Sequence, residues 1–177
     1  GNDTVIGGLG DDVLNGGAGT DLVVFAGATA ITADLGLSTA QATGLGNDTL
    51  LNLENITSGS GADSLRGDGA DNTLISAAGN DTLVGGSGND VLNGGTGTDL
   101  ADFSGTTAVT VTLALSTAQA TGYGNDRLIG IENLLGGDGN DLLTGNALAN
   151  SINGAAGDDT LIGGLGNDVM DGGAGLD

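Results

Sequence analysis

The chain has 177 residues, of which 38 are glycine, and it contains no proline, cysteine, histidine or tryptophan. Twenty-three acidic residues stand against two arginines, giving a formal net charge of −21. This charge argues against a nucleic-acid partner, because phosphate binding needs a basic face. No apolar run is long enough for a membrane span, and with no cysteine there is no disulfide or thiolate site. With three aromatic residues in all, we expect a narrow interior of small aliphatic side chains in place of an ordinary globular core.

A nonapeptide unit, G-G-x-G-x-D-x-U-x with U an apolar residue, recurs along the chain and is clearest from Gly79 to Asp102. Thirteen of the 21 aspartates occupy its sixth position, and asparagine takes that position twice. In chain order the sixth-position residues are Asp3, Asp12, Asp21, Asp48, Asp63, Asn72, Asp81, Asp90, Asp99, Asp126, Asp141, Asn150, Asp159, Asp168 and Asp177.

A longer period lies over the period of nine. An offset of 78 positions relates Phe25 to Phe103, Glu54 to Glu132, and the STAQATG segment at 38–44 to the one at 116–122. We therefore predict one continuous solenoid over residues 1–177. Cassette one covers 1–78, with an insert at about 25–43, cassette two covers 79–156, with an insert at about 103–121, and a partial third cassette covers 157–177. Gly1 and Asp177 both lie within a repeat, so we expect a piece of a longer protein.

Within one unit, the glycines allow positive φ and a sharp turn, and the three residues after the aspartate are extended. Two units make one coil, and successive coils pair as parallel strands roughly 4.8 Å apart. The predicted fold class is thus all-β, a parallel β-roll. The predicted inward residues are Leu14, Val23, Leu65, Leu74, Leu83, Leu92, Leu143, Ile152, Leu161 and Met170.

Stacking the turns brings aspartates of units i and i+2 about one strand spacing apart. Two unit charges at that distance repel by roughly 1 kcal/mol in water and by several at a lower effective dielectric. A hard divalent cation between the turns would remove the repulsion. All-oxygen ligands without His or Cys suit Ca²⁺ better than Zn²⁺ or the geometrically stricter Mg²⁺.

These units, for example GGSGNDVLN at 85–93 and GGLGNDVMD at 163–171, resemble the RTX, or hemolysin-type, calcium-binding repeat. The resemblance implies a right-handed parallel β-roll with Ca²⁺ in the glycine-rich turns, and export from a Gram-negative bacterium by a type I secretion machinery. It implies as metal ligands the sixth-position residues given above, and the carbonyls of Gly8, Gly10, Gly17, Gly19, Gly59, Gly61, Gly79, Gly86, Gly88, Gly95, Gly97, Gly137, Gly139, Gly157, Gly164, Gly166, Gly173 and Gly175.

Pairing sixth positions that lie two units apart predicts seven sites. These are Asp3 with Asp21, Asp63 with Asp81, Asn72 with Asp90, Asp81 with Asp99, Asp141 with Asp159, Asn150 with Asp168, and Asp159 with Asp177. Two more are expected if Asp48 pairs with Asp63 and Asp126 with Asp141. Seven to nine calcium ions would supply +14 to +18 against the charge of −21.

The inserts lack turn aspartates. Alternation over 109–115 predicts a strand with one buried face, and we expect longer, calcium-free solenoid strands here, with a protruding hairpin as the alternative. Phe25, Phe103 and Tyr123 are expected to fill the core, the alternative being sugar-binding platforms. Arg66 and Arg127 are expected to neutralise carboxylates or to lie at the surface.

No nucleophile–base pair is present, so we expect no catalysis by this chain and no catalytic or organic-cofactor site. The expected function is that of a secreted, extracellular or cell-surface calcium-binding module that folds on Ca²⁺ after export. The alternatives are a self-assembling stalk or lattice module of an adhesin or surface layer, and the C-terminal roll of a secreted protease, lipase or epimerase.

Overall fold

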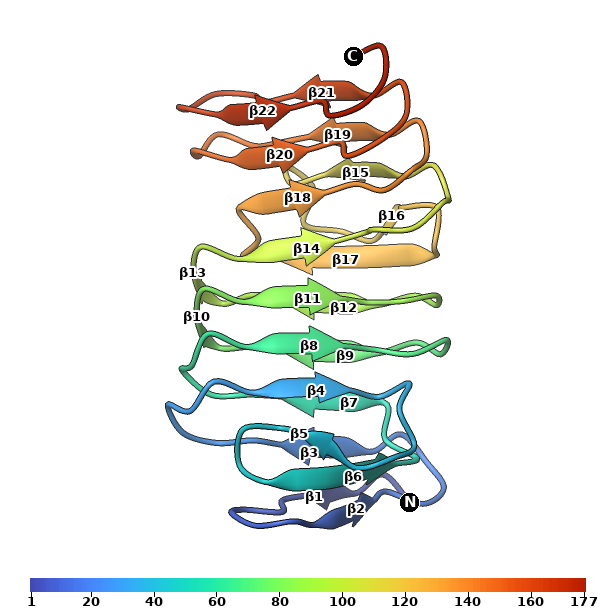
Figure 1. The fold of residues 1–177 in the computed structure, drawn as a ribbon, viewed down its shortest axis with the longest axis vertical. Coiled ribbons are helices and arrows are strands. Elements are labelled where there is room, and N and C mark those ends of the chain that lie inside the picture. Colours follow the sequence, from blue (N-terminus) through green and yellow to red (C-terminus); the bar gives the residue numbers. More distant parts are fainter.

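The computed structural model describes residues 1–177 and consists of 22 short strands joined by turns. Figure 1 shows them stacked as flattened coils, from the N-terminal end at the bottom to the C-terminal end at the top. Nearly all strand pairs are parallel, which confirms the predicted all-β parallel roll. None of its elements is a helix, so no helix could cross a membrane.

The strands form two faces that enclose the interior. From the N-terminal end, the first face contains β1 (Thr4–Val5), β3 (Leu22–Val24), β7 (Asn55–Thr57), β9 (Thr73–Ile75), β12 (Val91–Asn93), β17 (Asn125–Ile129), β16 (Gln119–Ala120), β15 (Thr110–Thr112), β19 (Leu142–Thr144) and β21 (Thr160–Ile162). The second contains β2 (Val13–Asn15), β6 (Asn47–Leu51), β5 (Gln41–Ala42), β4 (Thr32–Asp34), β8 (Ser64–Arg66), β11 (Thr82–Val84), β14 (Leu100–Asp102), β18 (Asn133–Leu135), β20 (Ser151–Asn153) and β22 (Val169–Asp171). The two remaining strands, β10 (Ala78–Gly79) and β13 (Thr96–Gly97), pair with each other within stacked turns.

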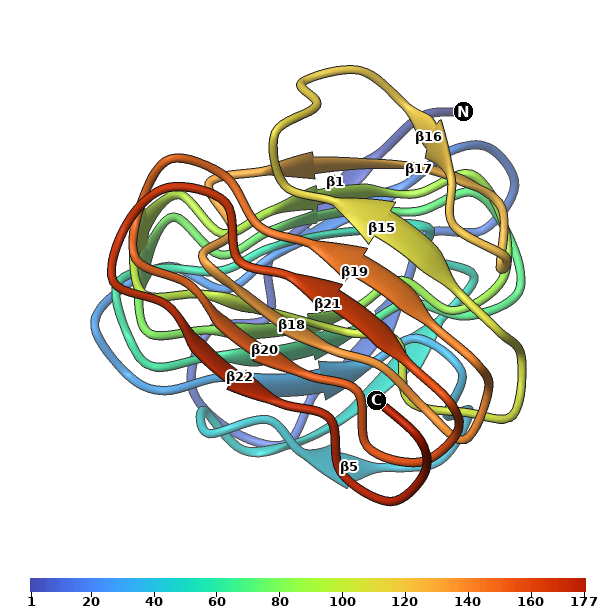
Figure 2. The same ribbon diagram turned by 90° about the horizontal axis from the view of Figure 1, so that it is seen from above.

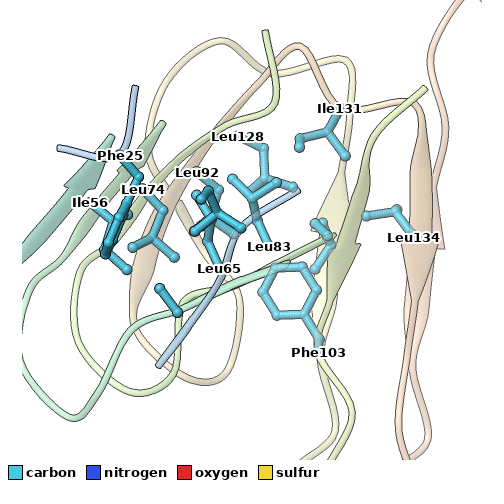
Figure 3. Close-up of a cluster of buried hydrophobic side chains, with 14 of the residues drawn as sticks. Phe25, Ile56, Leu65, Leu74, Leu83, Leu92, Phe103, Leu128, Ile131 and Leu134 are labelled. Atoms are coloured by element: carbon cyan, nitrogen blue, oxygen red, sulfur yellow. The ribbon is translucent and has the colours of Figure 1, made fainter. Parts of the chain in front are cut away.

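The middle residue of the three-residue strands points into the roll and stacks on its counterpart in the next coil. Leu65, Leu83 and Leu92 are completely buried, and Figure 3 shows them gathered between the two faces. The register is the predicted one of two nonapeptide units, as in Leu83 on Leu65. Of the predicted inward residues, Leu161 is only partly buried and Met170 is 52% exposed, because their strands β21 and β22 are the last of the two faces and have no strand stacked above them.

Each insert folds back into the sheet. After β3 the chain forms β4 and reverses into β5, which pairs antiparallel with β6, while β6 stacks in parallel on β2. The side-chain amide of Gln41 fastens β5 to β4. It accepts the Asp34 N–H at 2.8 Å and donates to the Asp34 carbonyl at 2.9 Å. Gln119 makes the same two bonds to Thr112 in the second insert.

The expectation of longer, continuous strands in the inserts was therefore wrong. The strand predicted over 109–115 is only the three residues of β15, and Leu115 at the end of the alternation is 44% exposed. The residues that were expected to extend this strand instead form the loop that leads into β16, and β16 pairs antiparallel with β17. The hairpin is integrated into the face, and Figure 2 shows the loop before β16 standing outside the roll.

The two inserts lie on opposite faces of the roll. The strand β6 stacks on β2 in the second face, whereas its counterpart β17 stacks on β12 in the first. The reason is that the chain crosses between faces seven times from β2 to β12, and an odd number of crossings exchanges the faces. Figure 2 shows β5 and β16 at opposite edges of the roll.

Candidate metal-binding turns

The sixth-position side chains form hydrogen-bonded ladders up the turns. In each of the seven predicted pairs, the Oδ1 of the upper aspartate accepts the main-chain N–H of the residue 18 positions earlier, at 2.6–3.0 Å. Each carboxylate therefore serves first as a link between coils. The stacking that the spacing predicted is present for all seven pairs.

Across the inserts the ladder continues with pairings that the sequence reasoning missed. Asp48 accepts the N–H of Asp12 at 2.9 Å, and Asp126 accepts that of Asp90 at 2.8 Å, each across 36 positions. The expected pairing of Asp48 with Asp63 was wrong, because β6 stacks on β2 and not below β8. The same register separates Asp126 from Asp141.

On the same face of the roll as each hairpin, the ladder meets the insert itself. There, Asp63 and Asp141 accept the N–H groups of the insert residues Ile31 and Val109, both at 2.8 Å. Insert residues without a carboxylate thus occupy the positions below them. The long gaps between sixth positions, from Asp21 to Asp48 and from Asp99 to Asp126, were the available signal for these shifted registers.

Glu54 and Glu132 are further ladder members that the predicted ligand set lacked. Their Oε2 atoms accept the N–H groups of Asp21 at 2.7 Å and Asp99 at 2.9 Å. Pairing by two units suggested that Asp99 ends its stack of turns, but Glu132 continues the stack beyond it. The signal was the recurrence of a glutamate in the LENI and IENL segments.

The second carboxylate oxygen divides the turns into two kinds. In one kind, Oδ2 is buried and has no hydrogen-bond partner. This is the case at Asp12, Asp21, Asp63, Asp81, Asp90, Asp99 and Asp159. A buried unpaired carboxylate oxygen is costly, so these seven atoms indicate a missing cationic partner.

Burial of these carboxylates has an electrostatic consequence. The pKa of Asp90 is raised to about 6, chiefly by desolvation; the hydrogen bond from the Asn72 N–H lowers it, and the nearby carboxylates of Asp126, Asp71 and Asp68 contribute to the rise. Burial likewise raises the pKa values of Asp63 and Asp99. Raised pKa values mean that the metal-free turns disfavour the charged form that a cation would stabilise.

In the other kind of turn, the protein itself satisfies the side chain. The Nδ2 of Asn72 donates to the Glu54 carbonyl and that of Asn150 to the Glu132 carbonyl, both at 2.8 Å. Their Oδ1 atoms accept the N–H groups of Asp68 and Asn146, also at 2.8 Å. These amides close their turns without an ion.

In three further turns, another group of the protein donates a hydrogen bond to the second carboxylate oxygen of the aspartate. The hydroxyls of Thr43 and Thr121 donate to the Oδ2 atoms of Asp48 and Asp126, and the N–H of Gly137 donates to Asp141 Oδ2 at 2.9 Å. Sequence reasoning did not single out the two threonines, although both stand five positions before a sixth-position aspartate.

The predicted glycines line the stacked turns. Thirteen of them have positive φ, namely Gly8, Gly10, Gly17, Gly19, Gly79, Gly86, Gly88, Gly95, Gly97, Gly157, Gly164, Gly166 and Gly173. Gly97 shows why a side chain is excluded, since a β-carbon there would collide with the carbonyl oxygen of Gly79 one coil below. Gly59, Gly61, Gly137, Gly139 and Gly175 adopt other conformations.

The donor set fits a hard cation held largely by main-chain oxygens. No three acidic side chains converge on one point, so each carboxylate needs carbonyl groups to complete a coordination sphere. The turns provide these carbonyls in closely stacked layers. A flexible shell of carboxylate and carbonyl oxygens matches the preference of Ca²⁺.

Stacked glycine-rich turns with buried, unpaired aspartates are the features of a calcium-binding β-roll. The family model described as RTX calcium-binding nonapeptide repeat (4 copies) matches residues 1–27, 54–83, 66–101, 129–147 and 144–177. The chain therefore belongs to the RTX calcium-binding repeat family and is a calcium-binding repeat segment. The unmatched residues, 28–53 and 102–128, contain the inserts. The comparison with curated proteins gave no match.

Proposed function

We propose that this segment is a structural module whose folding is switched on by calcium outside the cell. The observation that carries the proposal is the set of seven buried aspartate Oδ2 atoms without partners, in a chain with a net charge of −21. Without cations, self-repulsion and unpaired buried oxygens oppose the compact state. Calcium binding then contributes its free energy directly to folding.

The proposal includes secretion. Free Ca²⁺ is low in a cytosol and millimolar outside cells, and extracellular calcium modules typically bind at about 0.1–1 mM. An unfolded chain would suit export by a type I secretion machinery, and the roll would form after export. We propose no catalytic role for this chain.

Calcium titration of the purified chain tests this proposal. Circular dichroism and hydrodynamic radius are measured in chelator, in Mg²⁺ and in rising Ca²⁺, with bound ions counted by calorimetry. We expect an extended chain in chelator and a cooperative, calcium-specific transition to a compact β-rich state. A compact β-rich state that persists in chelator would contradict the proposal.

A stalk or lattice module is a second candidate, favoured by the placement of the insert loops on opposite faces. Alternating loops could make contacts on both sides of a filament or sheet. Light scattering of the calcium-loaded chain tests this. Concentration-dependent assembly that chelator reverses would support it, and a strictly monomeric roll would count against it.

A further inference from the structure

A cavity of about 240 Å³ opens where the second insert meets the preceding coils. We refer to it as the insert pocket. Its polar lining consists of Arg66, Asp68, Ser87, Asp102, Ser104 and Tyr123. It adjoins the sixth-position ladders, since Gly86 also lines it and the Asp68 N–H donates to Asn72 Oδ1, but no sixth-position residue is part of its lining.

The internal repeat shows that this lining is not required by the fold. Four of the six polar pocket residues have counterparts 78 positions earlier, and all four counterparts are apolar. Ser87 corresponds to Leu9, Asp102 to Val24, Ser104 to Ala26, and Tyr123 to Leu45. The hairpin strand stacks on the preceding strand in the same way in both cassettes, so these four positions accept apolar residues and their polar character in cassette two is not required by that stacking.

The aromatic ring in the pocket is held in place. The carbonyl of Tyr123 accepts the Gly88 N–H at 3.2 Å, as that of Leu45 accepts the Gly10 N–H at 3.0 Å in cassette one. The hydroxyl of Tyr123 lies against Gly105, where a β-carbon would collide with it. Tyr123 is half-buried and can present part of its ring to a ligand.

The other two aromatic residues differ from Tyr123. Phe25 and Phe103 are buried core residues with 3% and 6% exposure. Of the three aromatic side chains considered as sugar platforms, only Tyr123 is thus both accessible and surrounded by polar groups.

The polar groups supply both acceptors and donors. Asp102 uses Oδ1 for the Ser104 N–H at 2.7 Å, which leaves its Oδ2 available to a ligand. The side chain of Arg66 is 54% exposed and its only ion pair, to Asp34, spans 3.9 Å. Guanidinium donors and a carboxylate acceptor beside an aromatic ring suit a molecule with several hydroxyl groups.

We propose that the insert pocket binds one neutral saccharide ring, with its C–H face on Tyr123 and its hydroxyls on Asp102 and Arg66. The two pocket carboxylates and the overall charge of −21 disfavour anions, and Arg66 disfavours a compact cation. The volume is smaller than the about 300–1,000 Å³ of drug-sized sites, so it limits the occupant to a single ring.

Tyrosine fluorescence provides a local probe, because Tyr123 is the only tyrosine and the chain has no tryptophan. The calcium-loaded chain is titrated with the methyl glycosides of glucose, galactose and mannose, and with ethanolamine and acetate as charged probes. We expect saturable fluorescence changes with at least one glycoside, and amide shifts at Ser87 and Ser104 in NMR spectra. No response to any glycoside, or a response to the charged probes alone, would overturn the proposal.

Cassette one supplies the variants. Tyr123→Leu and Asp102→Val install the residues that the same fold already carries at positions 45 and 24, so calcium-dependent folding should persist. We expect each to weaken the NMR-detected affinity by about tenfold. The control Leu45→Tyr, which adds a ring without the polar partners, should create no second site. Equal sugar affinity in Tyr123→Leu and the unaltered chain would overturn the assignment.

Discussion

The turns that end at Asp81 and Asn72 belong to neighbouring units but are closed in different ways. Asp81 accepts the Asp63 N–H through Oδ1, and its buried Oδ2 has no partner. The amide of Asn72 uses its oxygen for Asp68 and its nitrogen for the Glu54 carbonyl. The same position of the repeat is therefore satisfied by an amide at Asn72 and left with an unpaired oxygen at Asp81, and we propose that the dependence on calcium differs from turn to turn.

The largest effect is expected for Asp81→Ala. This change removes a buried acceptor from the Asp63 N–H and a proposed ligand from two adjacent turns. We expect a loss of about 3 kcal/mol in the free energy of unfolding at saturating calcium, measured by urea denaturation. Asp99→Ala should cost a similar amount, because Glu132 continues that column.

The control for Asp81→Ala is Asp138→Ala, which removes an exposed carboxylate. Its free energy of unfolding should change by less than about 0.5 kcal/mol. Equal effects of the Asp81 and Asp138 changes would contradict a structural role for the ladder.

Acidification should stabilise the metal-free roll. The folded pKa of Asp90 is about 6, above the unfolded value of about 3.9. Protonation of Asp90 therefore stabilises the folded state, and this stabilisation is fully present below the unfolded pKa and is lost as the pH rises through about 6. The raised pKa values of Asp63 and Asp99 act in the same direction.

We expect β structure to increase as the pH is lowered from 7 to about 4, measured by circular dichroism in buffer depleted of calcium with a chelating resin. A metal-free spectrum that does not change over this range would show that these carboxylates do not oppose folding.

Asn72→Asp should convert an amide-closed turn into a calcium-dependent one. The new carboxylate cannot donate to the Glu54 carbonyl, so we expect about 1–2 kcal/mol of destabilisation at low calcium. High calcium should restore part of this loss. Asn150→Asp is the matched variant, since its contacts to Asn146 and Glu132 are the same. A calcium midpoint unchanged in both variants would refute the distinction between the two kinds of turn.

The smallest effect is expected for Thr121→Val, which keeps the shape of the side chain and removes the hydroxyl bound to Asp126. We expect a loss of about 1 kcal/mol at saturating calcium, measured by thermal unfolding. Calorimetry should find no fewer bound ions than in the unaltered chain. Loss of an ion would show that Thr121 belongs to a metal site.

Local repetition explains why much of the fold could be predicted. Asp63, Asp81 and Asp99 follow one another at intervals of two nonapeptide units, and that spacing alone places them in one column. Register across the inserts could not be read in the same way. Asp48 lies above Asp12 only because β5 and β6 form a hairpin, and no local pattern specifies how far the chain folds back.

The repeat pattern also did not predict which turns leave a carboxylate oxygen unpaired and which turns satisfy it. Whether a sixth-position side chain is satisfied depends on which partner the fold brings to it, such as the Glu54 carbonyl in the neighbouring coil for Asn72. The insert pocket is a similar case, since Arg66 and Tyr123 are far apart in the chain and meet only in the stacked coils.

The sequence by itself determined the parallel roll, its register of two units per coil, its leucine interior and its oxygen ligands for a hard cation, because each follows from contacts between adjacent, similar units. The tertiary structure decided the path of the inserts, their placement on opposite faces, and which aspartates remain unpaired. These features arise from contacts between segments that no fixed period relates, so only the folded chain specifies them.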